Sequence, residues 1–167
     1  GDPLLAQVGP TTIADLLAAT GSMFPNGRRV EIRTRTVPAL TPGVIEALVS
    51  GASAMTSPLS AIAMHSLHGA AARVASEDMA FAARTPHLVV ENVAIWESGD
   101  DAPHRAWARD LSTALAAEAL PGGYVNLLGP DDTDQIAHVY GANRDRLLAA
   151  KHRFDPDGVF SATPLPW

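Results

Sequence analysis

The sequence predicts an α+β domain in two layers, a mostly antiparallel sheet with helices packed on one face. Strand patterns occur in runs separated by helical patterns, whereas a parallel sheet needs strict β-α-β alternation. The chain has 167 residues and is 47% apolar. It is therefore long and apolar enough to bury one core, and we expect a single domain over residues 1–167.

A short helix and a strand are expected first. The helix lies within residues 2–27, with Thr11 or Thr12 as its cap, and residues 25–27 form a turn. Residues 28–37 then alternate as a strand. One face of this strand carries Val30, Ile32, Thr34 and Thr36, and the other carries Arg29, Glu31, Arg33 and Arg35.

The middle of the chain predicts a helix followed by strands. Thr41-Pro42 begins the helix, because proline is tolerated at the first helical position. Its apolar face comprises Val44, Ile45, Leu48, Val49 and Ala52. Residues 58–74 contain one or two strands, with a bulge or close backbone approach at Gly69. We expect a further short strand at 79–84. The clearest strand is Leu88–Trp96, whose nearly continuous apolar run indicates that both faces are covered.

The C-terminal half begins with the best helix, which starts at Asp101-Ala-Pro103 and stops at residues 120–123. Its predicted face consists of Trp107, Leu111, Ala114, Leu115 and Glu118. A short strand at Tyr124–Leu128, helices at 133–140 and 142–154, a turn at 155–158 and an extended tail follow.

Composition excludes several classes of function. The formal net charge of −6 argues against a surface for nucleic acid or anionic membrane, since both need basic patches. The chain has no cysteine, which rules out disulfides, thiolate metal sites and a cysteine nucleophile. No apolar stretch approaches the ~20 residues of a membrane span. Because no signal peptide is visible, we expect a cytoplasmic protein.

Conventional catalytic motifs are absent. There is no Gly-x-Ser-x-Gly elbow and no Gly-x-Gly-x-x-Gly after a strand. His65 and His68 are three residues apart, so that in a strand they would point to opposite faces, and we expect both to be surface or packing histidines and no metal site.

Glu91 interrupts the apolar strand, with Val89, Val93 and Ile95 as neighbours on its own face. A carboxylate among β-branched residues is desolvated, which makes it a better proton acceptor and favours a general base. Two alternatives remain open: this face is solvated, or Glu91 pairs with an arginine such as Arg33 or Arg35.

Tyr124 and Asn126 are two residues apart on a short strand, so both side chains would point the same way. A tyrosyl hydroxyl and a carboxamide on one face can orient a substrate or cofactor through hydrogen bonds. The alternative is a half-buried sheet position, where the tyrosine packs and the asparagine lies at the edge.

Several segments together resemble one family. They are Gly122-Gly-Tyr-Val-Asn-Leu-Leu-Gly129, Tyr140-Gly-Ala-Asn143, Arg146-Leu-Leu-Ala-Ala-Lys151 and Arg153-Phe-Asp-Pro-Asp-Gly-Val-Phe160. In order and spacing they resemble the C-terminal end of berberine-bridge-enzyme-like FAD-linked oxidases. Weaker similarity in residues 24–28, 57–60, 69–74 and 81–96 extends the resemblance over most of the chain from about Phe24.

The resemblance implies the substrate-side domain of an FAD-dependent oxidoreductase that oxidises a small hydroxylated or related substrate by hydride transfer to flavin. It assigns the catalytic base to Glu91, a catalytic role to Tyr124 and a cofactor-binding role to Asn126. The family's N-terminal FAD-binding domain is absent from these 167 residues. We therefore expect the chain alone to bind no FAD and to be inactive, as a fragment of such an enzyme.

The chain also departs from the family pattern. Its tail, Ser161-Ala-Thr-Pro-Leu-Pro-Trp167, lacks the usual asparagines, and His68-Gly69 replaces a Gly-Gly. A different class of function is a free-standing module that has lost the flavin domain and binds a small ligand or a protein. Without that domain, Val89, Val93 and Ile95 would form an exposed patch, which predicts a twofold homodimer through this face.

Overall fold

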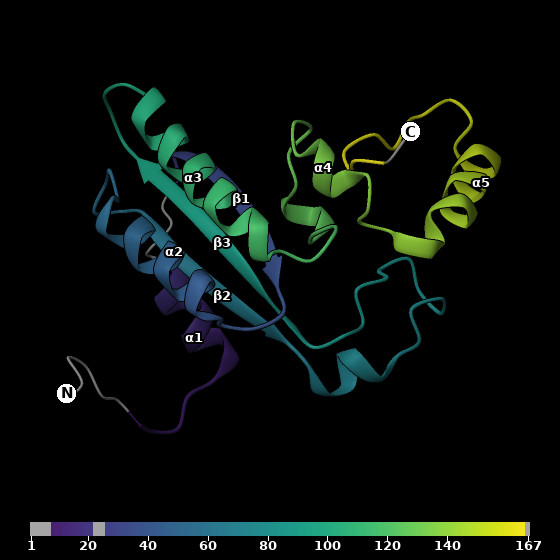
Figure 1. Cartoon of the computed structure of the whole chain (residues 1–167), viewed down its shortest axis with the longest axis horizontal. Helices are drawn as coiled ribbons and strands as arrows, with labels where there is room; N and C mark the ends of the chain where they lie inside the picture. The colour runs from purple at the N-terminus through teal and green to yellow at the C-terminus, as the bar shows by residue number, and fades with distance from the viewer. Residues whose placement is uncertain (1–7, 22–25, 166–167) are drawn as a thin grey trace.

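The computed structural model describes residues 8–21 and 26–165. Three strands, β1 (Arg29–Val37), β2 (Ala61–Leu67) and β3 (His87–Trp96), form a sheet with the order β1-β3-β2. Both pairings are antiparallel. Helices α2 (Pro42–Ser53) and α3 (Ala102–Leu115) lie side by side across one face of this sheet (Figure 1). The predicted α+β fold with helices on one face is therefore confirmed.

The main core lies between the sheet and the two long helices. It is built from the helix-facing side chains of β1 and β3 and from the inner faces of α2 and α3. Its buried members are Val37, Val44, Val90, Ala94, Trp96, Trp107, Ala108, Leu111 and Leu115. Thr41 caps α2 by accepting a hydrogen bond from the backbone N–H of Val44 at 3.2 Å. Helix α2 thus begins where the sequence predicts.

The register divides the strand residues between two faces. On β3, Val89, Glu91, Val93 and Ile95 point away from α2 and α3, because the intervening residues pack in the core. We call this side the Glu91 face. Their cross-strand partners on it are Val30, Ile32, Thr34 and Thr36 of β1 and Ala61, Ala63 and His65 of β2.

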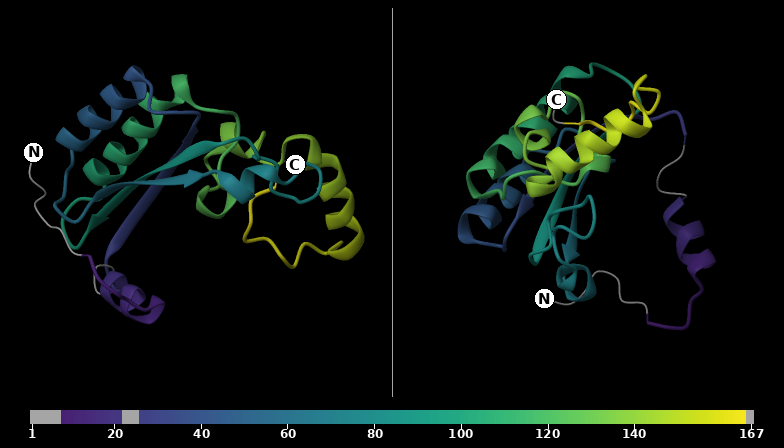
Figure 2. Two further views of the ribbon diagram at one scale, coloured as in Figure 1. Left: turned by 90° about the horizontal axis from the view of Figure 1, so that it is seen from below. Right: turned by 90° about the vertical axis from the view of Figure 1, so that its right-hand side faces the viewer.

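The C-terminal segments form a second packed unit beyond one end of the sheet (Figure 2). It contains α4 (Thr133–Ile136), α5 (Arg144–Phe154) and the 3-10 helix η3 (Val125–Leu127), and it has a small core of Leu128, Ile136, Val139 and Tyr140. Helix α1 (Ile13–Gly21) stands away from the rest of the fold, and its Ile13 side chain is 79% exposed. Thr12 caps α1, since its hydroxyl accepts from the Asp15 N–H at 3.1 Å.

Three expectations about local structure are wrong. Residues 79–84 form no strand. Tyr124–Leu128 is not a strand either, because its carbonyls are engaged locally: the Leu127 N–H donates to the Tyr124 carbonyl at 2.9 Å. Gly69 has a φ of +62° and open space around it, so it serves a turn into the 3-10 helix Gly69–Arg73 (η1) rather than a close approach. Pro25, in the predicted turn, lies outside the described residues.

The helical faces also differ in part from the predicted ones. In α2, Val44 and Leu48 pack as predicted and Ala47 joins them, whereas Ile45, Val49 and Ala52 are exposed. In α3, Ala114 is exposed and Ser112 is buried. The reason is that α2 and α3 also contact each other, which rotates their buried faces toward the groove between them.

Candidate functional site

A hollow of ≈ 470 Å³ lies on the Glu91 face, where the start of β3 meets the end of β2. Glu91 and Val89 contribute its floor, and Tyr124 reaches it from the segment before η3. The remaining lining residues are His65, Ser66, Leu67, His68 and Ala71. The sequence places these groups far apart, but the fold brings Glu91 and Tyr124 to one hollow.

Glu91 lies between neighbours on the two flanking strands. Its side chain is 18% exposed, and its Oε1 atom lies 3.1 Å from Nε2 of His65. The residue opposite Glu91 on β1 is Thr34. It is 1% exposed, and its hydroxyl makes no hydrogen bond. The carboxylate is thus largely enclosed but still borders the hollow.

The alternative pairing of Glu91 with an arginine is wrong. Arg33 and Arg35 lie on the helix-covered face of β1, opposite Asn92 and Val90. Their guanidinium groups bind carboxylates of residues 131–134 and Glu31 instead. His65 is therefore a partner of Glu91 that the sequence interpretation missed, and only the strand register reveals it.

Tyr124 and Asn126 contact each other although they are not on a strand. The Asn126 side-chain N–H donates to the Tyr124 hydroxyl oxygen at 2.9 Å. Because this oxygen already accepts, the hydroxyl proton remains available for donation to a ligand. The Tyr124 ring packs edge-on against Phe81 at a centroid distance of 6.2 Å. These contacts fix the phenol between two hollows.

The second hollow is larger and adjoins the first at Tyr124. Its volume is ≈ 770 Å³, and it is lined by Tyr124, Asn126 and Phe81, together with α5 and the tail segment 159–165. The Tyr140 hydroxyl donates to the Pro164 carbonyl at 3.2 Å and ties the tail to this unit. Burial raises the pKa of Tyr140 above its usual value.

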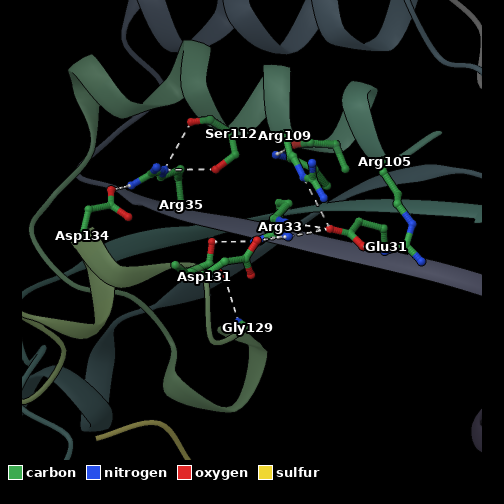
Figure 3. A network of polar contacts seen from close by, with 12 residues as sticks. Glu31, Arg33, Arg35, Arg105, Arg109, Ser112, Gly129, Asp131 and Asp134 are labelled. Carbon is green, nitrogen blue, oxygen red and sulfur yellow. Dashed lines mark hydrogen bonds and ion pairs between the residues drawn. The ribbon is translucent and has the colours of Figure 1, made fainter. Parts of the chain in front are cut away.

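A polar network fastens residues 129–134, which follow the Tyr124 segment in the chain, to β1 (Figure 3). Arg33 donates to Glu31, Asp131 and Asp132 at 2.6, 2.7 and 3.0 Å. Asp132 also accepts from the Gly129 N–H at 2.8 Å. These bonds raise the pKa of Arg33, with Asp131 as the largest cause. The same hydrogen bond holds the pKa of Asp131 below its usual range.

Arg35 forms a second anchor beside this network (Figure 3). Its side chain donates to Asp134 at 2.6 Å and to the Ser112 hydroxyl at 3.1 Å. The bond to Arg35 lowers the pKa of Asp134. Strand β1, helix α3 and the C-terminal unit are therefore linked at two neighbouring positions of one strand.

The expected apolar patch around Glu91 is smaller than predicted. Val89 is only 7% exposed and Ile95 only 3%, so the expectation that both are open to solvent is wrong. Val89 is covered because Tyr124 and Ala71, from segments that follow α3 and β2, line the same hollow above it. Val93 is half-buried and Val30 is 49% exposed on this face, and the twofold homodimer stays a prediction.

His65 and His68 were expected to point to opposite sides of a strand, but both line the same hollow. The reason is that β2 ends at Leu67, so that strand alternation does not extend to His68. Within residues 8–21 and 26–165, no group of three or more His, Asp or Glu side chains could hold a metal ion. No helix in this described part is long and apolar enough to cross a membrane.

Comparison with known proteins identifies the relatives of this chain. Residues 123–164 match the family described as "Berberine and berberine like". The chain is 35% identical over 95 residues to the uncharacterized FAD-linked oxidoreductase YgaK of Bacillus subtilis. This match covers 56% of this chain and 21% of that protein. The chain is 28% identical over 167 residues to the FAD-linked oxidoreductase aurO of Gibberella zeae, covering 96% and 32%. The chain thus spans at most a third of these relatives.

Solved structures share the fold. Physcomitrella patens BBE-like 1 matches with a TM-score of 0.68 at 17% identity, covering 84% of this chain and 30% of that one. Berberine bridge enzyme from Eschscholzia californica matches with a TM-score of 0.64 at 19% identity, covering 83% and 33%. GilR, an oxidoreductase of gilvocarcin biosynthesis, matches with a TM-score of 0.64 at 20% identity, covering 79% and 31%. The predicted resemblance to berberine-bridge-enzyme-like FAD-linked oxidoreductases is confirmed.

Proposed function

We propose that this chain is the substrate-side domain of an FAD-linked oxidoreductase that oxidises a small hydroxylated or related substrate by hydride transfer to flavin. The observation that carries the proposal is the hollow on the Glu91 face. There a half-enclosed carboxylate and a tyrosyl hydroxyl from distant segments line one space. The FAD-binding domain would be the partner that covers this face.

The residues present fit one wall of a flavin site. Val89, Leu67 and Ala71 give the hollow an apolar lining, and Tyr124 adds a hydroxyl fixed by Asn126. Cofactor sites are mostly apolar with a few well-placed polar groups, and usually measure about 300–1,000 Å³. The hollow is open to solvent on one side and offers contacts to only one face of a bound dinucleotide, which cannot offset the entropy cost of ordering it, so the proposal includes that the chain alone binds no FAD.

The bound flavin would supply the hydride acceptor. The Glu91 carboxyl group would accept the proton of the substrate hydroxyl while the adjacent carbon gives its hydride to the flavin. The Tyr124 hydroxyl would donate a hydrogen bond to an oxygen of the substrate or cofactor and so orient that molecule. Asn126 would hold Tyr124 in this orientation and contribute to the cofactor wall.

The test is to produce the chain together with its FAD-binding domain and to substitute Glu91→Gln. The purified protein should show a flavin spectrum, and a screen of sugars, alcohols and secondary metabolites should yield one that bleaches it. Glu91→Gln should keep the flavin and slow bleaching by about 10²- to 10⁴-fold, the usual effect of removing a general base.

A matched control is Glu46→Gln, since Glu46 is exposed on α2 and remote from the hollow. This variant should bleach at the rate of the parent protein. A full-length protein that takes up no flavin would refute the proposed function. A Glu91→Gln variant as fast as the Glu46→Gln variant would refute the role of Glu91 alone.

A further inference from the structure

We propose that His65 is a positioning residue for the Glu91 carboxylate, an inference that rests on the proposed function of Glu91. The register makes the two residues diagonal neighbours, since Ala63 lies opposite Glu91 and His65 lies opposite Val89. Diagonal neighbours on one sheet face are about 7–8 Å apart, which long side chains can bridge. Here the bridge is made, with Nε2 of His65 3.1 Å from Oε1 of Glu91.

The other neighbours of Glu91 do not offer this support. Ala63, directly across β2, has no polar atom, and the hydroxyl of Thr34, directly across β1, makes no hydrogen bond. Arg33 and Arg35 lie on the opposite face and are engaged by other carboxylates. The side chain that contacts the Glu91 carboxylate within residues 8–21 and 26–165 is thus that of His65.

A close polar contact between Nε2 and one carboxylate oxygen has a defined chemical effect. A glutamate has three rotatable side-chain bonds, and a carboxylate that is not held can turn out of the hollow. The imidazole at 3.1 Å from Oε1 restricts this rotation and leaves the second oxygen free to accept a proton. Because a base must lie within about 2.6–3.2 Å of the proton it takes, loss of this constraint should slow proton transfer rather than weaken cofactor binding.

His68 provides a matched control within the same hollow. It is the same residue type, lines the same space and forms no ion pair with Glu91. Since the His65 side chain is 66% exposed, replacing it removes little packing, and His65→Ala should fold. His65→Gln retains an N–H donor on a side chain of similar length, so it should preserve part of the effect.

The first test needs neither flavin nor substrate. In the isolated chain, the ¹³C resonance of the Glu91 carboxyl group, assigned by its loss in Glu91→Gln, should move in His65→Ala. It should move less in His65→Gln and stay in place in His68→Ala. A resonance that does not respond to His65→Ala, or responds equally to His68→Ala, would overturn the contact.

The second test uses the flavin-loaded full-length protein and the substrate found by bleaching. His65→Ala should keep its FAD content and KM but lower kcat by about 10- to 100-fold, in keeping with a displacement of about 1 Å at a reacting group. His65→Gln should recover at least part of the rate, and His68→Ala should match the parent. Equal rates in His65→Ala and the parent would overturn the proposal. If the parent binds no flavin, the proposed function fails, whereas the carboxyl resonances still test the contact.

Discussion

At the scale of single residues, the buried charges show how strongly a side chain depends on its partners. Arg33 is 8% exposed and meets Glu31 and Asp132, whose side chains are 11% and 9% exposed. Desolvation of such groups is offset only while each charge is paired. Alternation along β1 predicts that Arg33 lies on a polar face of the strand. This face is polar, but it is enclosed rather than exposed to solvent.

Replacing Arg33→Leu should destabilise the chain by about 3–5 kcal/mol, because it leaves the enclosed Asp132 carboxylate without its cation and Glu31 with only the more distant Arg105 and Arg109. Urea unfolding at neutral pH measures the difference. Arg73→Leu is the control, since Arg73 is exposed, and surface substitutions usually change stability by less than about 0.5 kcal/mol. Equal unfolding midpoints for the two variants would contradict this account of the network.

The residues of the candidate site were predictable to different degrees. Glu91 could be found because a charge inside an apolar strand stands out in the sequence. Tyr124 and Asn126 were found through family resemblance, although the strand expected to carry them is a 3-10 helix. The contact of His65 could not be predicted, since it depends on which residue of β2 lies opposite Val89, and this register is a long-range property.

At the scale of elements, the sequence predicts best the helices and strands whose ends are marked by a capping residue, a proline or the limits of an apolar run. Strand β3 and helix α2 lie within one or two residues of their expected positions, because an apolar run and a Thr-Pro cap are read locally. Residues 79–84 and 124–128 were wrongly expected to be strands. Their patterns suit a strand, but a strand also needs a partner edge, and neither segment finds one in the fold.

The contact between α2 and α3 depends on a missing side chain at Gly51. A Cβ atom there would lie 2.7 Å from both Leu111 methyl groups, and Leu111 is 4% exposed in the core. Alanine in a helix interior gains about 1 kcal/mol over glycine. Overpacking typically costs about 1–3 kcal/mol, so the clash should prevail.

Gly51→Ala should therefore destabilise the chain, which thermal or urea unfolding will measure. Gly43, in the same helix, is the matched control. Its added Cβ would meet Oε1 of Glu118 at 2.8 Å, but Glu118 is an exposed side chain that can move. Gly43→Ala should be neutral or slightly stabilising. A Gly51→Ala variant as stable as the Gly43→Ala variant would show that α2 and α3 can separate without loss.

At the scale of the whole molecule, two layers and a C-terminal unit are joined by ion pairs on one strand. Arg33 binds Asp131 and Arg35 binds Asp134, so that residues 129–134 are fixed to the sheet through β1 (Figure 3). The Tyr124 segment lies between α3 and this anchor. The geometry of the candidate site therefore depends on carboxylates that do not themselves line the Glu91 hollow.

This dependence predicts a loss of stability in acid. The pKa of Asp131 is lowered by Arg33, and that of Asp134 by Arg35. Because each folded-state pKa is below the unfolded value of about 3.9, the stabilisation is complete above that value and is lost as the pH falls through the folded pKa. The Asp131 and Asp134 side chains are 59% and 63% exposed, so each pair contributes less than about 1 kcal/mol.

Urea midpoints measured from pH 2 to 7 should thus be flat above about pH 5 and should fall below about pH 4. The double variant Asp131→Asn, Asp134→Asn should be less stable than the parent at pH 7 and should lose less on acidification, since it lacks two of the titrating groups. The Tyr124 ring resonances report the site directly: they should shift in acid together with the loss of these pairs, and in the double variant already at neutral pH. A double variant with the acid profile and Tyr124 resonances of the parent would show that residues 129–134 are held by packing alone.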